Sequence, residues 1–165
     1  MAVVAVNSTL ITNINASPPV QNAPWAANSR ERVTGAYATV TSGDSINSTY
    51  RLMTLNPLSR MVSLRLFNNA ITSGAMNVGL HRTLADGGAA VAASAYASAI
   101  SIATASLTGT ELKFSARTID QIVQQIWQHA GLSAAPLYSL DLVCTLTAAA
   151  AATGFIGFEV VTANA

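Results

Sequence analysis

The stretch Arg60–Phe67, RMVSLRLF, decides the fold class of this chain. When it is written as an extended strand, Val62, Leu64 and Leu66 fall on one face and polar residues such as Ser63 fall on the other. This alternation with a period of two is typical of a β-strand with one buried and one exposed face. We therefore expect strands of this kind to dominate the fold.

Further short segments of similar character follow along the chain, separated by turn residues such as Ser42–Asp44 and Asp86–Gly88. The expected strands are Val33–Thr41, Thr49–Leu55, Arg60–Phe67, Met76–Arg82, Ile100–Leu107, Leu112–Ala116, Leu137–Thr147 and Phe155–Thr162. The segment Ala89–Ala99 is ambiguous, because alanine favours a helix whereas the neighbouring segments favour strands. This pattern predicts an all-β fold, with a jelly-roll-like β-sandwich as the leading arrangement.

The last two expected strands are adjacent in sequence and are predicted to pair as an antiparallel hairpin. Their inward faces are expected to carry Leu140, Leu142, Cys144, Leu146, Ile156, Phe158 and Val160. On the same pattern, Asp141 and Glu159 are expected on the exposed face of that hairpin.

One short α-helix interrupts the strands. Thr118 and Gln121 have the spacing of a capping box, in which the two side chains satisfy the free amides of the first turn. Apolar residues then recur every three or four positions, at Ile119, Ile122, Val123, Ile126, Trp127 and Ala130. Gly131 follows at the position where a helix commonly ends in a left-handed residue.

Residues 1–32 differ from the remainder and are expected to form an extended N-terminal arm on a domain of residues 33–165. This segment contains three of the five prolines and has no charge before Arg30. Its apolar residues favour an arm that becomes ordered on a partner over a simple disordered terminus. The candidate partner-binding residues are Val3, Val4, Val6, Leu10, Ile11, Ile14, Trp25, Arg30 and Arg32. Arg30–Arg32 is equally compatible with a solvated hinge, and Trp25 with a side chain that folds back on its own domain.

Composition limits the partners. Of the 165 residues, 9% are charged and the formal net charge is +1, which excludes a nucleic-acid binder that works through a broad basic field. Alanine accounts for 31 residues, so the positive mean hydropathy overstates the affinity for a membrane. The uncharged windows Gly87–Leu107 and Leu142–Phe158 are interrupted by Ser, Thr and Gly, and no membrane span is expected. So few charges favour a protein that works in an assembly.

Few residues are suited to nucleophilic or metal chemistry. Cys144 can be paired with His129 as a nucleophile and base, but it alternates with core leucines, so a buried structural thiol is favoured. A metal site would need His81, Asp86 and His129 to converge without any recognisable ligand spacing. Asp86–Gly88 is interpreted as a turn, because the other oxygen ligands of a calcium loop are missing. No metal, cofactor or catalytic residue is therefore assigned.

Carboxylate pairs remain a possible source of catalysis. Asp120, Asp141 and Glu159 are the candidates for such a pair, since a glycosidase needs only two suitably separated carboxylates. A small hydrolase would have to gather these groups with His81 in one cleft.

From about Tyr50 to Val161, the order of segments resembles the capsid decoration, or cement, proteins of tailed bacteriophages. The resemblance is carried by Ile71–Leu80, Asp86–Ala89, Tyr96–Ala99, Ile126–Leu132, Pro136–Tyr138 and Leu146–Ala150. These motifs are turns, strand faces and a capped helix, and the resemblance as a whole covers about two-thirds of the chain.

The resemblance implies a jelly roll that binds the outer surface of a phage shell as a homodimer or homotrimer. Its partners would be the major capsid protein and further copies of itself, with no nucleic acid and no membrane. The expected location is the outer surface of the virion, after synthesis in the host cytoplasm; the single cysteine fits a reducing compartment. The alternative function is a receptor- or carbohydrate-binding jelly roll of a head fibre or tail, whose available aromatics are Trp25, Tyr37, Tyr50, Tyr96 and Tyr138.

Overall fold

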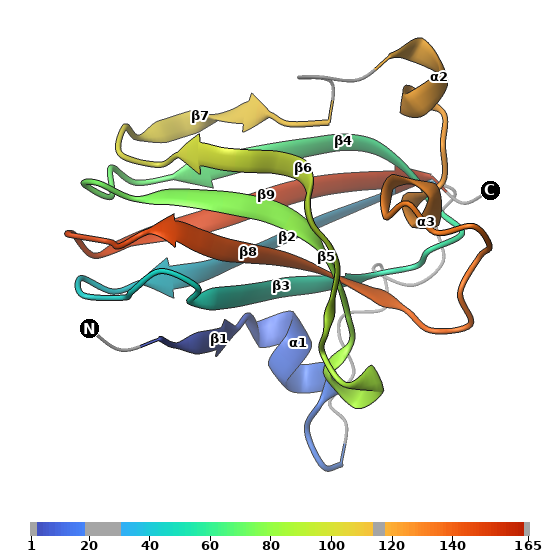
Figure 1. Ribbon diagram of the computed structural model, residues 1–165, viewed down its shortest axis with the longest axis horizontal. Coiled ribbons are helices and arrows are strands. Elements are labelled where there is room, and N and C mark those ends of the chain that lie inside the picture. The colour runs from blue at the N-terminus through green and yellow to red at the C-terminus, as the bar shows by residue number, and fades with distance from the viewer. Residues whose placement is uncertain (1–2, 19–30, 114–117, 164–165) are drawn as a thin grey trace.

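The computed structural model describes residues 3–18, 31–113 and 118–163, which form two β-sheets packed face to face (Figure 1). The strands are β1 (Ala5–Asn7), β2 (Glu31–Val40), β3 (Thr49–Leu55), β4 (Arg60–Asn68), β5 (Ala75–Arg82), β6 (Ala90–Ser101), β7 (Ser106–Glu111), β8 (Leu140–Ala148) and β9 (Gly154–Ala163). The helices are α1 (Thr9–Ile14), the 3₁₀ turn η2 (Leu84–Asp86), α2 (Ile119–Ile122) and α3 (Ile126–His129). The expected all-β sandwich with little helix is confirmed.

The order of the strands identifies the sandwich as a jelly roll. One sheet has the order β1-β3-β8-β5-β6 and the other β2-β9-β4-β7. The antiparallel pairs are nested around the β5–β6 hairpin: β4 pairs with β7, β3 with β8 and β2 with β9. A long paired ribbon is thus wrapped around itself, and successive pairs of strands lie in opposite sheets, as in a jelly roll.

The expected pairing of the last two strands is wrong, because they belong to different sheets. β8 pairs with β3 and β5, whereas β9 pairs with β2 and β4. The connection between them crosses from one sheet to the other. It is held by hydrogen bonds from the amides of Ala150 and Ala151 to the carbonyl oxygens of Asp44 and Thr72.

The inward faces of these two strands nevertheless form the core as expected. Leu140, Leu142, Cys144, Leu146, Ile156, Phe158 and Val160 are each at most 2% exposed. On β4 the expected face is only partly correct. Met61 is buried and Val62 is 39% exposed, because the pairing with β9 shifts by one residue between Met61 and Ser63. The bulge turns Val62 outward and leaves Leu64 and Leu66 inward.

The ambiguous alanine-rich segment is a strand, β6, and it passes very close to β5. An added Cβ at Gly79 would lie 2.2 Å from the carbonyl oxygen of Ala92. Ile100–Leu107, expected as one strand, contains the end of β6, a turn and the start of β7. Leu112 and Lys113 follow β7 outside any strand, and the rest of the expected strand Leu112–Ala116 lies outside the described residues.

The expected single helix is two short helices, because the chain leaves helical geometry after Ile122. Gln125 forms an isolated bridge with Arg60 of β4 and begins α3. Val123, expected on the apolar face, is 56% exposed, whereas Ile126 and Ala130 are buried. Gly131 has a φ of +70° and ends α3 as expected.

The described part of the N-terminal segment is docked on the sandwich. β1 pairs in parallel with β3, and α1 is helical where extended chain was expected. Ser8 caps α1 by accepting a hydrogen bond from the amide of Ile11, whose side chain is 1% exposed. β2 begins at Glu31, two residues before the expected start of the domain.

Candidate functional site

The candidate nucleophile and base lie in different environments. Cys144 is fully buried on β8 between β3 and β5, and burial raises the pKa of its thiol. His129 lies on α3, where its ring packs against that of Tyr96 with 5.7 Å between centroids. Cys144 therefore has the surroundings of a structural thiol.

The other candidate groups for chemistry are also placed on separate elements. Within residues 3–18, 31–113 and 118–163, no group of three or more His, Cys, Asp or Glu side chains is arranged to hold a metal ion. His81 is buried on β5, and its pKa is lowered by burial and by the nearby Arg51 cation. Asp86 lies on η2 and accepts a hydrogen bond from the Thr83 hydroxyl.

The three candidate carboxylates do not share a cleft. Asp120 lies exposed on α2, where a hydrogen bond from Thr118 lowers its pKa. Glu159 lies on the outer face of the four-stranded sheet, with 3.8 Å between its Oε1 and Nη1 of Arg65. Asp141 was expected to be exposed, but only 1% of it is accessible. Burial raises the pKa of Asp141, and hydrogen bonds from Thr54 and Arg51 partly offset that effect.

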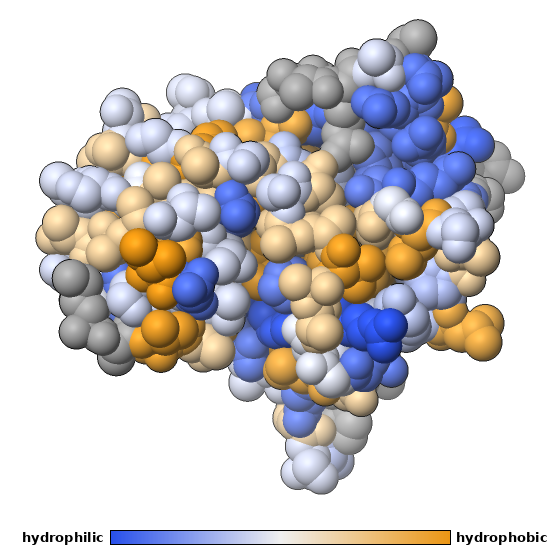
Figure 2. Space-filling view, viewed as in Figure 1, coloured by the Kyte–Doolittle hydropathy of each residue, from blue (hydrophilic) through white to orange (hydrophobic). Residues whose placement is uncertain are grey.

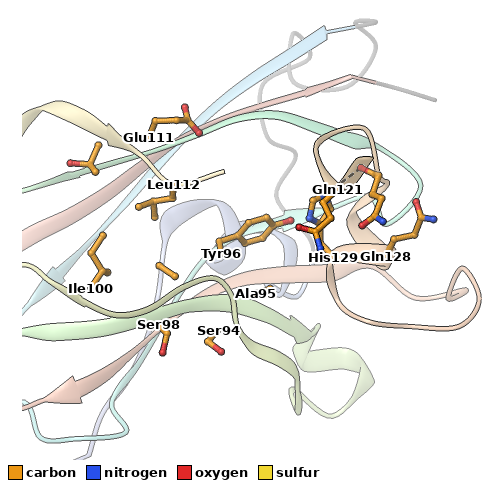
Figure 3. A pocket seen from close by; sticks show the side chains of 13 residues that line it. Ser94, Ala95, Tyr96, Ser98, Ile100, Glu111, Leu112, Gln121, Gln128 and His129 are labelled. Atoms are coloured by element: carbon orange, nitrogen blue, oxygen red, sulfur yellow. Dashed lines mark hydrogen bonds between the residues drawn. The ribbon is translucent and has the colours of Figure 1, made fainter. Parts of the chain in front are cut away.

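A groove of about 660 Å³ with polar walls lies between the edge strands β6 and β7, close to α2 and α3 (Figure 3). Its polar side chains are Ser94, Ser98, Thr110, Glu111, Gln121, Gln124, Gln128 and His129. Tyr96 points along the groove towards His129, but only 5% of it is exposed. Figure 2 shows that hydrophilic residues gather over α2 and α3, whereas weakly hydrophobic residues cover much of the strands on the same face.

The groove is suited to a neutral, polar, extended occupant. Glutamine amides both donate and accept hydrogen bonds. β6 contains neither a charged residue nor a proline, although edge strands are commonly protected by such residues. An open strand edge can also pair with a strand from another chain.

The residues predicted to bind a partner have different positions. Val3 is 64% exposed just before β1, Val6 packs against the core, and Ile11 is a buried residue of α1. Val4 is half-buried, and its amide donates a hydrogen bond to the Ser48 hydroxyl. The side chains of Leu10 and Ile14, and all of Trp25 and Arg30, lie outside the described part of the structure. Arg32 lies on β2, where its Nε is buried without a hydrogen-bond partner.

The available aromatics are divided between the interior and the surface. Tyr50 is buried and donates a hydrogen bond to Asp44, and burial with that contact raises its pKa. Tyr138 stacks under Arg82, whose guanidinium carbon is 4.8 Å from the ring centroid. Tyr37 is 70% exposed on β2.

The membrane prediction can be compared with the helices. Among the described residues, no helix has the length and apolarity required to span a membrane.

Comparison with known proteins gives a structural match. No family model matches the chain, and no curated protein matches it. A chain of the cyanophage Pam1 capsid asymmetric unit superposes with a TM-score of 0.57 at 12% sequence identity. The alignment covers 92% of this chain and 97% of that chain, so the two folds agree over almost their whole lengths.

Proposed function

We propose that this protein is a non-enzymatic structural protein of a phage head that binds the outer surface of the major capsid protein shell and cements it. The observation that carries the proposal is the match to a chain of the cyanophage Pam1 capsid asymmetric unit over 97% of that chain. The matched Pam1 chain is therefore of similar size to this protein and is aligned over almost its whole length. The motifs in Ile71–Leu80 and Ile126–Leu132, which resemble decoration proteins, support the same role.

The N-terminal segment is the proposed grip on the shell. β1 is the edge strand of its sheet, so its outer backbone edge is available to a strand of the capsid protein. Val3, at its start, offers an exposed apolar side chain. When many copies bind one symmetric shell, weak contacts of this kind would act together, so that the coat as a whole would be bound stably.

Binding to heads that lack this protein tests the proposal. Purified full-length protein is mixed with such heads, the heads are sedimented, and the decorated particles are imaged by cryo-electron microscopy. We expect ordered density on the outer surface, and weaker binding by Val3→Asp. Leu137→Asp is the matched control, because Leu137 is fully exposed in the loop between α3 and β8, across the molecule from β1 (Figure 1). Heads that remain undecorated at saturating protein would overturn the proposal.

The groove between β6 and β7 favours one alternative, a carbohydrate-binding module of a head fibre or tail. Amide and hydroxyl groups such as those of Gln124 and Ser98 are suited to sugar hydroxyls. A glycan array decides between the two functions. Specific glycan binding that is lost in Gln124→Ala, together with undecorated heads, would favour the alternative.

A further inference from the structure

The outer face of the four-stranded sheet, on the far side of the molecule in Figure 1, has a regular cross-strand pattern. In one row across the strands, Tyr37 of β2 lies opposite Gly157 of β9, and Gly157 lies opposite Phe67 of β4. The Phe67 ring lies over Gly109 of β7, where an added Cβ would come within 2.7 Å of the ring. Aromatic residues and glycines therefore alternate across the face.

This alternation leaves an apolar hollow next to projecting aromatic rings. A hollow of about 480 Å³ is lined by Tyr37, Phe67, Phe155 and the backbone at Gly35 and Gly157. Tyr37 beside it is 70% exposed. The face thus offers both a cavity and side chains that could fill the same cavity in another copy.

The next row of the same face carries the charges. Gly35, Glu159, Arg65 and Glu111 follow one another across β2, β9, β4 and β7. Arg65 and Glu159 occupy the centre of the sheet, and their side chains are 45% and 40% exposed. Opposite charges therefore stand side by side at the middle of the face.

We propose that this face pairs with the same face of a second copy, about a two-fold axis that runs along the strands between β9 and β4. Such an axis exchanges β9 with β4 and β2 with β7, while every row stays at its own level. Glu159 of each copy then lies opposite Arg65 of the other. Phe67, inclined towards β7 in its own copy, is directed to the hollow beside Gly157 in the other.

The register and the size of the face both support a second copy as the occupant. An isologous pair requires a patch that is complementary to itself. The central residues meet this requirement in charge, because Arg65 of each copy faces Glu159 of the other. With about 4.8 Å between strands and about 3.3 Å per residue, the 10 residues of β2, 9 of β4, 6 of β7 and 10 of β9 make a face of roughly 550 Å². Two such faces bury roughly 1,100 Å², which exceeds the roughly 1,000 Å² expected of a specific interface. Sheets that pack face to face are rotated by about 30° relative to each other. This rotation displaces residues near the two-fold axis less than residues at the edges of the sheet.

The dimer would serve the proposed cementing role, and its biological purpose rests on that proposal. Dimer formation itself is measured on the isolated protein, without phage heads. Sedimentation of the full-length protein should give a dimer of about 34 kDa, twice the 17.0 kDa chain. Arg65→Glu and Glu159→Arg should each raise the dimer dissociation constant by about a hundredfold, because like charges then face each other. Asp120→Arg is the matched control, since it alters the net charge equally on exposed α2 and should leave the dimer intact.

An equimolar mixture of the two single variants is the decisive sample. Arg65→Glu supplies two carboxylates and Glu159→Arg supplies two guanidinium groups, so the mixture should form a heterodimer. If one single variant does not fold, the double variant Arg65→Glu/Glu159→Arg is used, and it should dimerise like the wild type. A monomeric or trimeric wild type, dimeric single variants, a mixture that stays monomeric or a monomeric double variant would each overturn the pairing. None of these measurements involves phage heads, so the proposed dimer and the proposed cementing role can fail separately.

Discussion

Arg51 on β3 forms a buried ion pair with Asp141 on β8, with 3.0 Å between Nη1 and Oδ2. The same guanidinium donates hydrogen bonds to the carbonyl oxygens of Arg82, at the end of β5, and Gly88, before β6. Thr54 donates to the second oxygen of Asp141. One side chain of β3 therefore connects β8 with both strands of the β5–β6 hairpin at one end of the five-stranded sheet.

We expect Arg51→Met to lower the free energy of unfolding by about 3–5 kcal/mol, because it leaves the Asp141 carboxylate buried without its cation. Urea denaturation at pH 7 measures the change. The double variant Arg51→Met/Asp141→Leu should be more stable than the single one, since it removes both buried charges. A loss below about 1 kcal/mol for Arg51→Met would show that the pair is not a structural clamp.

Gly79→Ala should destabilise the protein strongly, because the new Cβ would lie 2.2 Å from the Ala92 carbonyl oxygen. Backbone cannot move aside as a flexible side chain does, so β6 would have to separate from β5. We expect a loss of about 3 kcal/mol or more in urea denaturation. Gly35→Ala is the control, since its Cβ would meet nothing nearer than 3.9 Å. Equal stability of the two variants would contradict the close crossing of β5 and β6.

The fold was predictable from the sequence where local patterns were sufficient. Alternation placed Leu142 and Phe158 in the core, and Gly131 marked the end of α3. The failures arose where tertiary contacts decide. The bulge that exposes Val62 depends on the pairing with β9, and the burial of Asp141 depends on Arg51 from a distant strand.

The candidate surfaces were less predictable for the same reason. Tyr37 was recognised as an available aromatic, but its position beside Gly157 and Phe67 follows from pairings between β2, β9 and β4. The alignment of Arg65 with Glu159 is likewise a matter of register. A single sequence does not specify which strands are neighbours, and the pattern of this face depends on those neighbours.

Stability should decrease as the pH falls from 7.5 to 5.5, because His81 is kept neutral in the folded protein. Burial and Arg51 lower its pKa below the ordinary value of 6.5, and its Nε2 is buried without a hydrogen-bond partner. Below pH 6.5 the unfolded chain therefore binds a proton that the native protein does not, at up to about 1.4 kcal/mol per pH unit. The raised pKa of Asp141 acts in the opposite direction, in a window above 3.8.

Urea denaturation at several pH values checks this dependence. His81→Gln should flatten the slope between pH 7.5 and 5.5, because glutamine does not titrate. A variant that keeps the full slope would show that another group is responsible for the loss of stability.

Ile11→Ala should release the N-terminal segment from the sandwich without unfolding the domain. Ile11 belongs to α1 and is 1% exposed, and truncation of a buried isoleucine costs about 2–5 kcal/mol. The amide of Ser8 bonds the Arg51 carbonyl, and the amide of Thr49 bonds that of Val4. Hydrogen exchange of these two amides should therefore become faster, while the amides of β8 and β9 stay protected.

Val3→Ala provides the contrast, because Val3 is 64% exposed and its truncation should change stability by less than about 0.5 kcal/mol. Unchanged exchange of Ser8 and Thr49 in Ile11→Ala would show that this side chain does not hold the segment in place. If the docked segment grips the shell, Ile11→Ala weakens head binding by disordering the grip, whereas Val3→Asp weakens it with Ser8 and Thr49 still protected. Head binding that is insensitive to both variants would assign the contact with the shell to another surface.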